Sequence, residues 1–422
     1  MKLRFGLFGC LVCWGCNNIN DATPSKRNDF IHFYEAAHSM TGVSAEATDN
    51  GYVILCNEAA KGFQRSVIIQ IDQKGAKISP DIILPDLTAH NLFVTEDGYY
   101  VVGDSIKNDL QVSIYAAMLL KVNPDGNIAK KLVLANRNDT TTTINFHGGA
   151  VTKNSQNNLI MLGTYKKGAQ TEKPYLIAID PVSFDTLWAK NYDVIERDYV
   201  NAKNVYITPT GHILWASALL KGNQSFSESY LGVPYIRENS TFENFSQFGE
   251  LTDQRLYPQD VCPAAASSFG YAIIGTFESS TGENPNIFFL RVDQFGTIIQ
   301  GSDRYFDGAK LSANNASVTS DESISDDTGD AIIATQDGGF VLGGSMKTTT
   351  FRGNGGTDIL LIKVDGQGNV LWNKIFGGSG NETISSIRET DDGGLLICGS
   401  NELSGLSSAF LMKTDKNGEL AD

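Results

Sequence analysis

Short apolar runs of five to eight residues recur along the whole chain, and each run is bounded by Gly, Asn or Asp. The runs are rich in Val, Ile, Leu, Tyr and Phe, a composition that favours strands buried on both faces. Asp-Gly and Asn-Gly pairs between the runs supply the positive φ angles of tight hairpins. The pattern predicts an all-β chain of short antiparallel strands.

The apolar runs belong to a repeat that is clearest near the C-terminus, where residues 337–345 (DGGFVLGGS) are matched by residues 392–400 (DGGLLICGS). A second marker, an Asp followed three residues later by Gly, closes several units, as in Asp365 to Gly368 and Asp415 to Gly418. It predicts a turn in which the Asp side chain accepts backbone hydrogen bonds and the Gly adopts the left-handed conformation. Less similar copies of this repeat can be followed upstream. In total there are seven units, which start at positions 51, 98, 158, 211, 270, 339 and 394.

Each unit predicts a four-stranded meander that must stack against its neighbours, and a ring of seven does this without free ends. The predicted fold is a single seven-bladed β-propeller covering residues 29–422. The last unit ends at Asp422, where its outer strand is due, whereas Phe30 to Glu35 is a strand without a unit of its own. We therefore expect Phe30 to Glu35 to complete the seventh blade and close the ring.

The two C-terminal units carry the motifs DGGFVLGG at residues 337–344 and IKVDGQGNVLWNKIFGG at residues 362–378. These motifs resemble a repeat common in exported bacterial propeller proteins, which are often lipoproteins or adhesin-like surface proteins. Residues 178–188 also resemble the tryptophan-docking repeat of quinoprotein propellers. Only two of the seven units carry that tryptophan, so the second resemblance concerns architecture and the sequence predicts no cofactor.

The amino terminus has the layout of a secretion signal, with Lys2 and Arg4 before the apolar run Phe5 to Trp14. Gly15-Cys16 resembles the cleavage and lipidation site of bacterial lipoproteins, although the usual Leu three residues before the cysteine is here Cys13. The resemblance implies a signal peptide over residues 1–15, a lipid on Cys16 and a flexible polar tether over residues 16–28. It places the protein on the cell envelope, anchored in the membrane through its N-terminal lipid and facing the surface or the periplasm of the outer membrane. Secretion without lipidation is the alternative.

The formal net charge is −15, and no basic run interrupts the acidic composition. Nucleic-acid partners are therefore not expected, because binding to phosphate backbones needs clustered Lys and Arg. After the signal only Cys56, Cys262 and Cys398 remain. Their wide spacing fits neither a disulfide framework nor a zinc site, so we expect small buried apolar side chains.

No catalytic or metal-binding motif is present, so the sequence predicts no catalytic, metal or cofactor residues. Two segments depart from the repeat plan. Residues 307–330 are polar and predict a mobile surface loop. Residues 226–262 carry aromatic side chains on a polar background, which suits protein or sugar contacts unless they pack a diverged fourth blade. This candidate partner surface comprises Tyr230, Tyr235, Phe242, Phe245, Phe248 and Tyr257.

The absence of motifs favours a non-enzymatic binding or scaffolding module whose partner is an envelope protein or a glycan. The alternative is a polysaccharide hydrolase or lyase, because a propeller can gather carboxylates from blades far apart in sequence. A cluster of acids with shifted pKa values in the axial pocket would favour that alternative.

Overall fold

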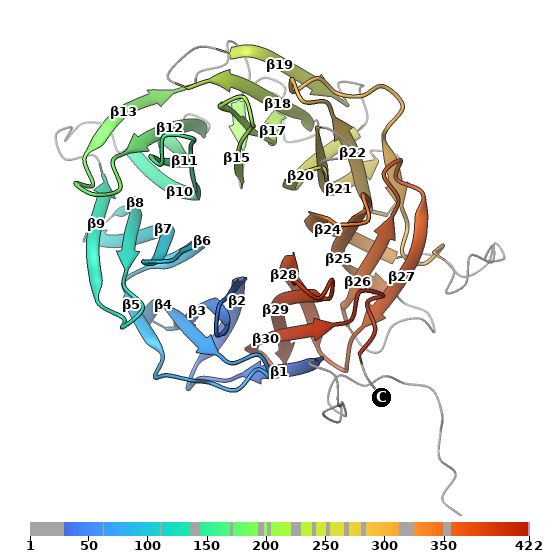
Figure 1. Cartoon of the computed structure of the whole chain (residues 1–422), viewed down its shortest axis with the longest axis horizontal. Coiled ribbons are helices and arrows are strands. Elements are labelled where there is room, and N and C mark those ends of the chain that lie inside the picture. Colours follow the sequence, from blue (N-terminus) through green and yellow to red (C-terminus); the bar gives the residue numbers. More distant parts are fainter. Residues whose placement is uncertain are drawn as a thin grey trace, which may run out of the picture.

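The computed structural model describes residues 29–420 apart from gaps at 62, 110–111, 136–143, 169–171, 193–197, 201–203, 221–228, 239–241, 250–253, 266–269, 280–283, 312–324 and 349–355. The described chain is all β, with seven four-stranded antiparallel blades arranged in a ring (Figure 1). The predicted seven-bladed propeller is confirmed. None of the described residues forms a helix that could span a membrane.

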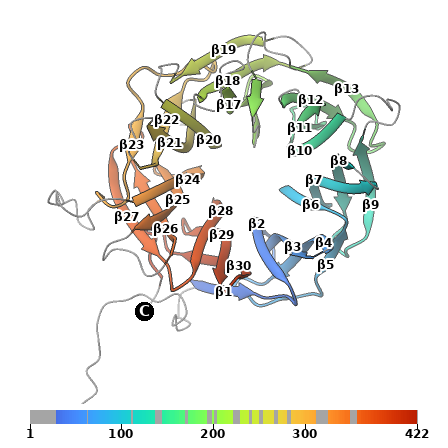
Figure 2. The same ribbon diagram turned by 180° about the vertical axis from the view of Figure 1, so that it is seen from behind.

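Three regular blades begin the ring. They contain β2 (Ser39–Thr48), β3 (Gly51–Ala60), β4 (Phe63–Ile71) and β5 (Ile82–Pro85); β6 (Thr88–Thr95), β7 (Gly98–Asp109), β8 (Val112–Val122) and β9 (Ile128–Leu134); and β10 (Ile144–Lys153), β11 (Leu159–Lys167), β12 (Lys173–Ile179) and β13 (Thr186–Asn191). In each blade the first strand lies next to the axis and the fourth at the rim (Figure 2).

The fourth blade is irregular, because its two inner strands are interrupted. It contains β14 (Asp198–Val200), β15 (Val205–Ile207), β16 (His212–Trp215), β17 (Ser217–Leu220), β18 (Ser229–Arg237) and β19 (Phe242–Phe248). The inner position is shared by β14 and β15, which pair with β17 and β16. Both β16 and β17 then pair with the long β18.

The last three blades return to the regular plan. They contain β20 (Gln254–Pro263), β21 (Tyr271–Ser279), β22 (Asn286–Val292) and β23 (Arg304–Phe306); β24 (Ser325–Ala334), β25 (Phe340–Thr348), β26 (Asp358–Val364) and β27 (Val370–Phe376); and β28 (Asn381–Glu389), β29 (Leu395–Leu403), β30 (Leu406–Thr414) and the N-terminal β1 (Phe30–Tyr34). Residues 325–330 belong to β24, so the expectation of a surface loop across all of 307–330 is wrong at its C-terminal end. Alternate buried positions in this polar stretch, Ser325, Asp327 and Gly329, give it the period of a strand.

The ring is closed by pairing between the two ends of the chain. Strand β1 pairs antiparallel with β30, with Phe30 opposite Lys413 and Tyr34 opposite Ala409. Figure 1 shows β1 in blue beside β30 in red. Tyr34 is buried, and its hydroxyl donates to the carbonyl of Gly75 in the first blade at 2.9 Å. The predicted closure by the N-terminal strand is confirmed.

The core is divided into seven apolar clusters, one at each junction between neighbouring blades. Strands such as β3 are buried along most of their length because both faces meet another blade. Burial of each Val, Leu or Ile side chain contributes about 1.5–3 kcal/mol. Cys56, Cys262 and Cys398 are free thiols buried in these clusters, as expected from their spacing.

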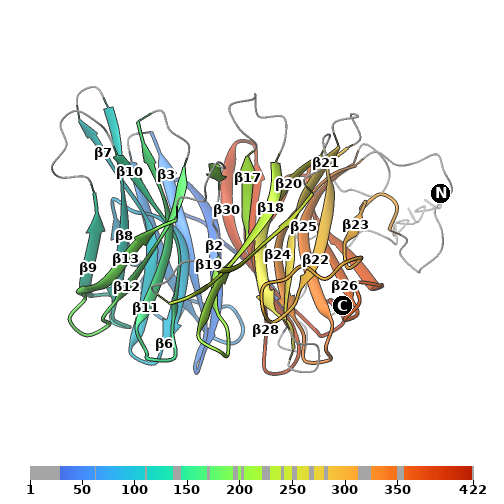
Figure 3. The same ribbon diagram turned by 90° about the horizontal axis from the view of Figure 1, so that it is seen from above.

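The two turn markers have the predicted structure. Oδ1 of Asp365 accepts hydrogen bonds from the backbone N–H groups of Gln367 and Asn369 at 2.9 and 2.8 Å, while Gly368 has φ +85°. These turns lie on one face of the ring, at the ends where the inner strands finish, and Figure 3 shows the blades edge-on between the two faces. The rigid turn face therefore leaves the opposite face for the functional site.

Candidate active site in the axial pocket

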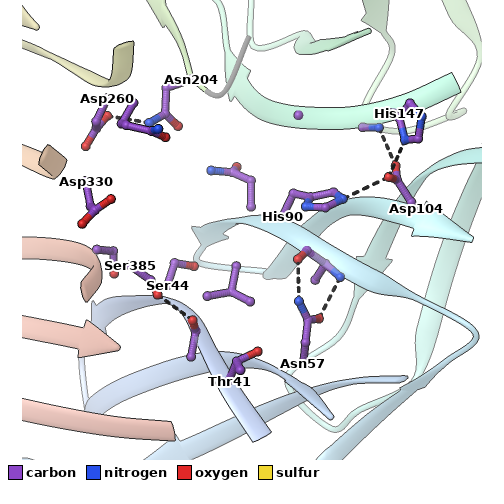
Figure 4. Close-up of a pocket in the computed structure, with 18 of the residues that line it drawn as sticks. Thr41, Ser44, Asn57, His90, Asp104, His147, Asn204, Asp260, Asp330 and Ser385 are labelled. Carbon is purple, nitrogen blue, oxygen red and sulfur yellow. Dashed lines mark hydrogen bonds and ion pairs between the residues drawn. The ribbon is translucent and has the colours of Figure 1, made fainter. Parts of the chain in front are cut away.

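A cavity of about 650 Å³ lies on the propeller axis, and inner strands from all seven blades line it. It lies toward the face at which the inner strands begin, because Thr41 to Ser44 of β2 and Ile384 to Ser386 of β28 form its wall. Figure 4 shows the polar side chains that point into it. A blade contributes few residues to this cavity, and the ring brings them together.

Six inner strands carry a β-bulge at the same level of the cavity wall. In each, the pairing with the second strand skips one residue, and all six skipped residues line the cavity: Val43, His90, Gly149, Gln259, Asp330 and Ser385. A bulge leaves its extra residue outside the regular pairing and re-aims its side chain. The bulges therefore form a ring of positions that point toward the axis.

Close contact between the blades fixes the level of this ring. A Cβ atom on Gly148 would lie 2.6 Å from Cγ1 of Val102 and 2.9 Å from the carbonyl oxygen of Gly103 in the preceding blade. A Cβ on Gly42 would likewise lie 2.5 Å from the carbonyl oxygen of Gly399. These inner strands lie too close to the preceding blade for any side chain, so the bulge residues beside them are held in place.

Two histidines and one carboxylate form the most connected group in the cavity. Oδ2 of Asp104 lies 2.8 Å from Nδ1 of His147 and 3.1 Å from Nε2 of His90. Its other oxygen accepts the backbone N–H of Gly148 at 2.8 Å. The ring of Tyr115 packs against His147 with 4.8 Å between the centroids. The group joins the second and third blades and is drawn with dashed lines in Figure 4.

The charges of this group depend on one another. Burial alone would raise the pKa of Asp104, but the hydrogen bonds from His147 and His90 outweigh burial and lower it. The same hydrogen bond from Asp104 raises the pKa of His147 above its usual value. Asp104 is therefore a carboxylate at neutral pH and accepts a hydrogen bond from Nδ1–H of His147, which leaves Nε2 of His147 as the acceptor or base.

A second carboxylate lies on a different wall of the cavity. Asp260, on β20, accepts the backbone N–H of Ile332 at 3.0 Å and that of Val261 at 2.7 Å, and the Asn204 amide donates to it. Burial raises the pKa of Asp260 to about 6, although these hydrogen bonds and the charge of Arg388 act in the opposite direction. Asp260 is thus an acid poised close to neutral pH.

An ion pair lies deeper along the axis. Nε of Arg388 donates to Oε1 of Glu46 at 2.7 Å, and these residues come from the last and first blades. The opposing charge of Glu46 holds the pKa of Arg388 above its usual value in spite of burial. Tyr206 belongs to the same group, and burial raises the pKa of its hydroxyl.

Within the described residues, no three His, Cys, Asp or Glu side chains are grouped as a metal ion requires.

Short polar side chains form hydrogen bonds across the blade junctions around the cavity. The amide of Asn57 exchanges two hydrogen bonds with the backbone of Ala89, both at 2.9 Å. Ser385 Oγ donates to the carbonyl of Gly42 at 2.7 Å.

The residues proposed from sequence lie elsewhere. Cys16, the signal peptide and the tether fall outside the described residues. The aromatic set lies on β18, β19 and β20, away from the cavity lining. Tyr235 is buried and Phe248 packs against the same apolar cluster between the fourth and fifth blades, which fits the alternative that these aromatics pack a diverged blade. Tyr235 also stacks on His212 with 4.5 Å between the ring centroids.

The residues of the cavity were missed, because none belongs to a linear motif. A usable signal exists in the repeat itself. His90 stands eight residues before Gly98, the first residue of the following strand, and Val43 stands eight residues before Gly51. Asp330 and Ser385 stand eight residues before Gly338 and Gly393. Alignment on these glycines would have identified four of the six bulge residues, because Asn157 and Ser267 stand eight residues after Gly149 and Gln259.

No protein-family model matches the chain, and no curated protein matches it in sequence. Among solved structures, it is similar to the polysaccharide lyase Uly1, with a TM-score of 0.55 and 7% identity over 90% of each chain. An α-L-arabinanase from Penicillium chrysogenum has a TM-score of 0.47 and 8% identity, covering 78% of this chain and 93% of its own. A mutant sialidase from Trypanosoma rangeli has a TM-score of 0.42 and 10% identity, covering 85% of this chain and 58% of its own.

At these identities the likeness shows the fold, a β-propeller. The expectation of a non-enzymatic binding or scaffolding module is nevertheless contradicted. One solved structure that shares the fold along nine-tenths of this chain is that of a polysaccharide lyase. The axial cavity, moreover, is lined by two acids with shifted pKa values, Asp104 and Asp260, as the enzyme alternative requires. The sequence analysis favoured a non-enzymatic module because the residues that line this cavity are dispersed over all seven blades and form no linear motif.

Proposed function

We propose that this chain is a carbohydrate-active enzyme that cleaves a polysaccharide in the axial pocket. The observation that carries the proposal is the presence, on different walls of one cavity, of Asp260 with a pKa of about 6 and of His147 oriented by Asp104. The likeness to a polysaccharide lyase along nine-tenths of the chain supports a polysaccharide as the substrate and leaves the mode of cleavage open to the residues of the pocket.

Cleavage of a glycosidic bond requires a proton for the departing oxygen and a base on the other side of the reacting sugar. Asp260 is partly protonated near neutral pH, so it can donate that proton. His147 donates Nδ1–H to Asp104, and its Nε2 can then accept a proton from water or from the substrate. Asp104 acts as a positioning residue, since it fixes the tautomer and raises the basicity of His147.

The cavity also suits a sugar by its lining. Hydroxyl and amide side chains from several blades surround the acids, and they can donate and accept hydrogen bonds with sugar hydroxyls. They are Thr41, Ser44, Asn91, Asn204, Gln259 and Ser386. A volume of about 650 Å³ lies within the usual range for small-molecule sites.

The test is an assay of the purified protein against a panel of neutral and uronate-containing polysaccharides. New reducing ends report either kind of cleavage, and ultraviolet absorbance of an unsaturated uronate reports elimination alone. Asp260→Asn and Asp104→Asn should each lower turnover by about 100-fold or more. The exposed Glu402 offers a matched control, and Glu402→Gln should keep wild-type turnover. Absence of cleavage across the panel, or full activity in both pocket variants, would contradict the proposal.

We further propose that the propeller is held on the cell envelope by a lipid on Cys16, with residues 16–28 as its tether. The apolar run before Gly15-Cys16 supports this. Mass spectrometry of the mature amino terminus should find an acylated cysteine. A free amine on any residue beyond Cys16 would contradict the anchor.

A further inference from the structure

The charged side chains that line the axial pocket are mostly acidic. Asp104, Glu172, Asp260 and Asp330 come from four different strands or connections around the ring. The basic side chains in the same lining are Arg388, His90 and His147. What the pocket can bind depends on which of these charges remain available to a ligand.

Arg388 is committed to a partner within the protein. Its guanidinium contacts Glu46 through Nε and one terminal nitrogen, and the other terminal nitrogen donates to the carbonyl of Ile387 at 2.8 Å. The two opposite charges lie in contact, so the pair carries no net charge, although Arg388 still lowers the pKa of Asp260. A ligand carboxylate could bind Arg388 only by displacing Glu46 and leaving that carboxylate without its ion-pair partner.

The histidines are similarly engaged, because both contact Oδ2 of Asp104. A single protonated histidine beside the carboxylate gives a neutral group. His90 and His147 can therefore transfer protons while their group with Asp104 stays nearly neutral. They do not form a binding site for an anion.

Two acids of the lining are bound by neutral groups. Asp260 accepts hydrogen bonds from one amide and two backbone N–H groups. Glu172 accepts a hydrogen bond from the hydroxyl of Thr164 at 3.1 Å, and its charge contributes to the raised pKa of His147. These interactions stabilise the carboxylates without cancelling their negative charge.

We infer that the axial pocket takes an uncharged glycan and excludes polyanionic ones, so that cleavage is hydrolytic. The inference rests on the proposed function and specifies its substrate class. Elimination requires a uronate carboxylate beside the carbon that loses its proton, and that carboxylate would enter a cavity of like charge with its arginine occupied. A neutral sugar has no such penalty, and its hydroxyls can donate to Asp260 and Glu172.

The test compares binding of neutral oligosaccharides with binding of oligo-uronates of matched length, by calorimetry at low salt, with and without added calcium. We expect the neutral set to contain a ligand whose affinity is insensitive to salt, and every oligo-uronate to bind at least about tenfold more weakly. An oligo-uronate that binds as tightly, in either condition, overturns the inference, and so does failure of both sets to bind. Binding of a neutral oligosaccharide without any cleavage supports the selection for an uncharged glycan, and it contradicts the proposed enzymatic function.

A variant isolates the role of charge. Glu172→Gln keeps the size of the side chain and its contact with Thr164 while removing one negative charge from the lining. Affinity for oligo-uronates should rise several-fold, whereas Glu402→Gln, at an exposed position, should leave it unchanged. Equal affinities for oligo-uronates in the wild type and in Glu172→Gln would count against exclusion by charge.

Discussion

Nδ1 of His147 lies 2.8 Å from Oδ2 of Asp104, a residue 43 positions away in the neighbouring blade. The hydrogen bond crosses a blade junction and therefore exists only in the assembled ring. It couples the packing of the second blade against the third to the protonation of a histidine in the axial pocket.

Asp104→Asn should return the pKa of His147 toward its ordinary value, because the variant removes the negative charge that raises it. The raised pKa also has a consequence for folding. The stabilisation from this pair is complete below the unfolded histidine pKa of about 6.5 and is lost as pH rises through the folded pKa. An NMR titration of the imidazole signals measures the pKa of His147 in the wild type and in Asp104→Asn. An unchanged His147 titration would show that Asp104 does not control it.

Removal of the N-terminal strand should unfold the whole propeller cooperatively. Deleting residues 29–38 removes β1 and leaves β2 intact, which exposes the edge of β30 and the apolar cluster around Tyr34. Tyr34→Ala alone should cost about 3–5 kcal/mol of unfolding free energy, the usual range for truncation of a buried aromatic side chain. Deletion of residues 17–28 is the control and should leave the melting temperature unchanged. If the protein lacking residues 29–38 melts like the wild type, the proposed role of closure is wrong.

Acid should destabilise the sixth and seventh blades through two equivalent ion pairs. Burial alone would raise the pKa of Asp337 and of Asp392. Hydrogen bonds from the buried Lys363 to Asp337 and from the buried Lys413 to Asp392 outweigh burial and lower both pKa values to about 2. Because the unfolded value is about 3.9, the stabilisation is present above pH 4 and is lost as pH falls toward 2. Chemical denaturation at several pH values should show that the free energy of unfolding falls less between pH 4 and pH 2 in the double variant Asp337→Asn, Asp392→Asn than in the wild type. A loss as steep as in the wild type would exclude these pairs as its cause.

The buried Asp327 predicts the opposite pH dependence. Burial raises its pKa to about 7, while Gly308 N–H and Ser325 Oγ donate to its Oδ2 at 2.6 and 3.0 Å. Between about pH 4 and pH 7 the folded state holds a proton that the unfolded state has released, so stability falls as pH rises through this window. Asp327→Asn should remove that slope, as followed by denaturant midpoints. The exposed Asp391 on the last blade supplies the control, since Asp391→Asn should retain the wild-type slope.

The sequence was sufficient to predict the fold because each blade repeats the same local signals. Turn residues such as Asp365 and Gly368 define their hairpins within a few positions. The continuous apolar runs between the turns define the strands. Closure by Phe30 to Tyr34 was also predictable, since the last unit lacked one strand and the N-terminus had one in excess.

The site was not predicted because it exists only across blades. Asp104 receives His147 from the next blade, and Asp260 accepts a hydrogen bond from Ile332 of the next blade. Neither residue stands in a motif, and the aromatic set around Tyr235 drew attention to a junction that is packed. The information that does exist is the common spacing of bulge residues such as His90 and Asp330 from the following turn.

The most direct measurement of the central claim is an NMR titration of the histidine imidazoles with a neutral oligosaccharide that the enzyme cleaves, recorded on Asp260→Asn to prevent turnover. Occupation of the axial pocket predicts saturable shifts of the His90 and His147 signals, with His38 unaffected. Saturable binding that leaves both pocket signals in place, or that shifts His38 instead, would contradict the axial site.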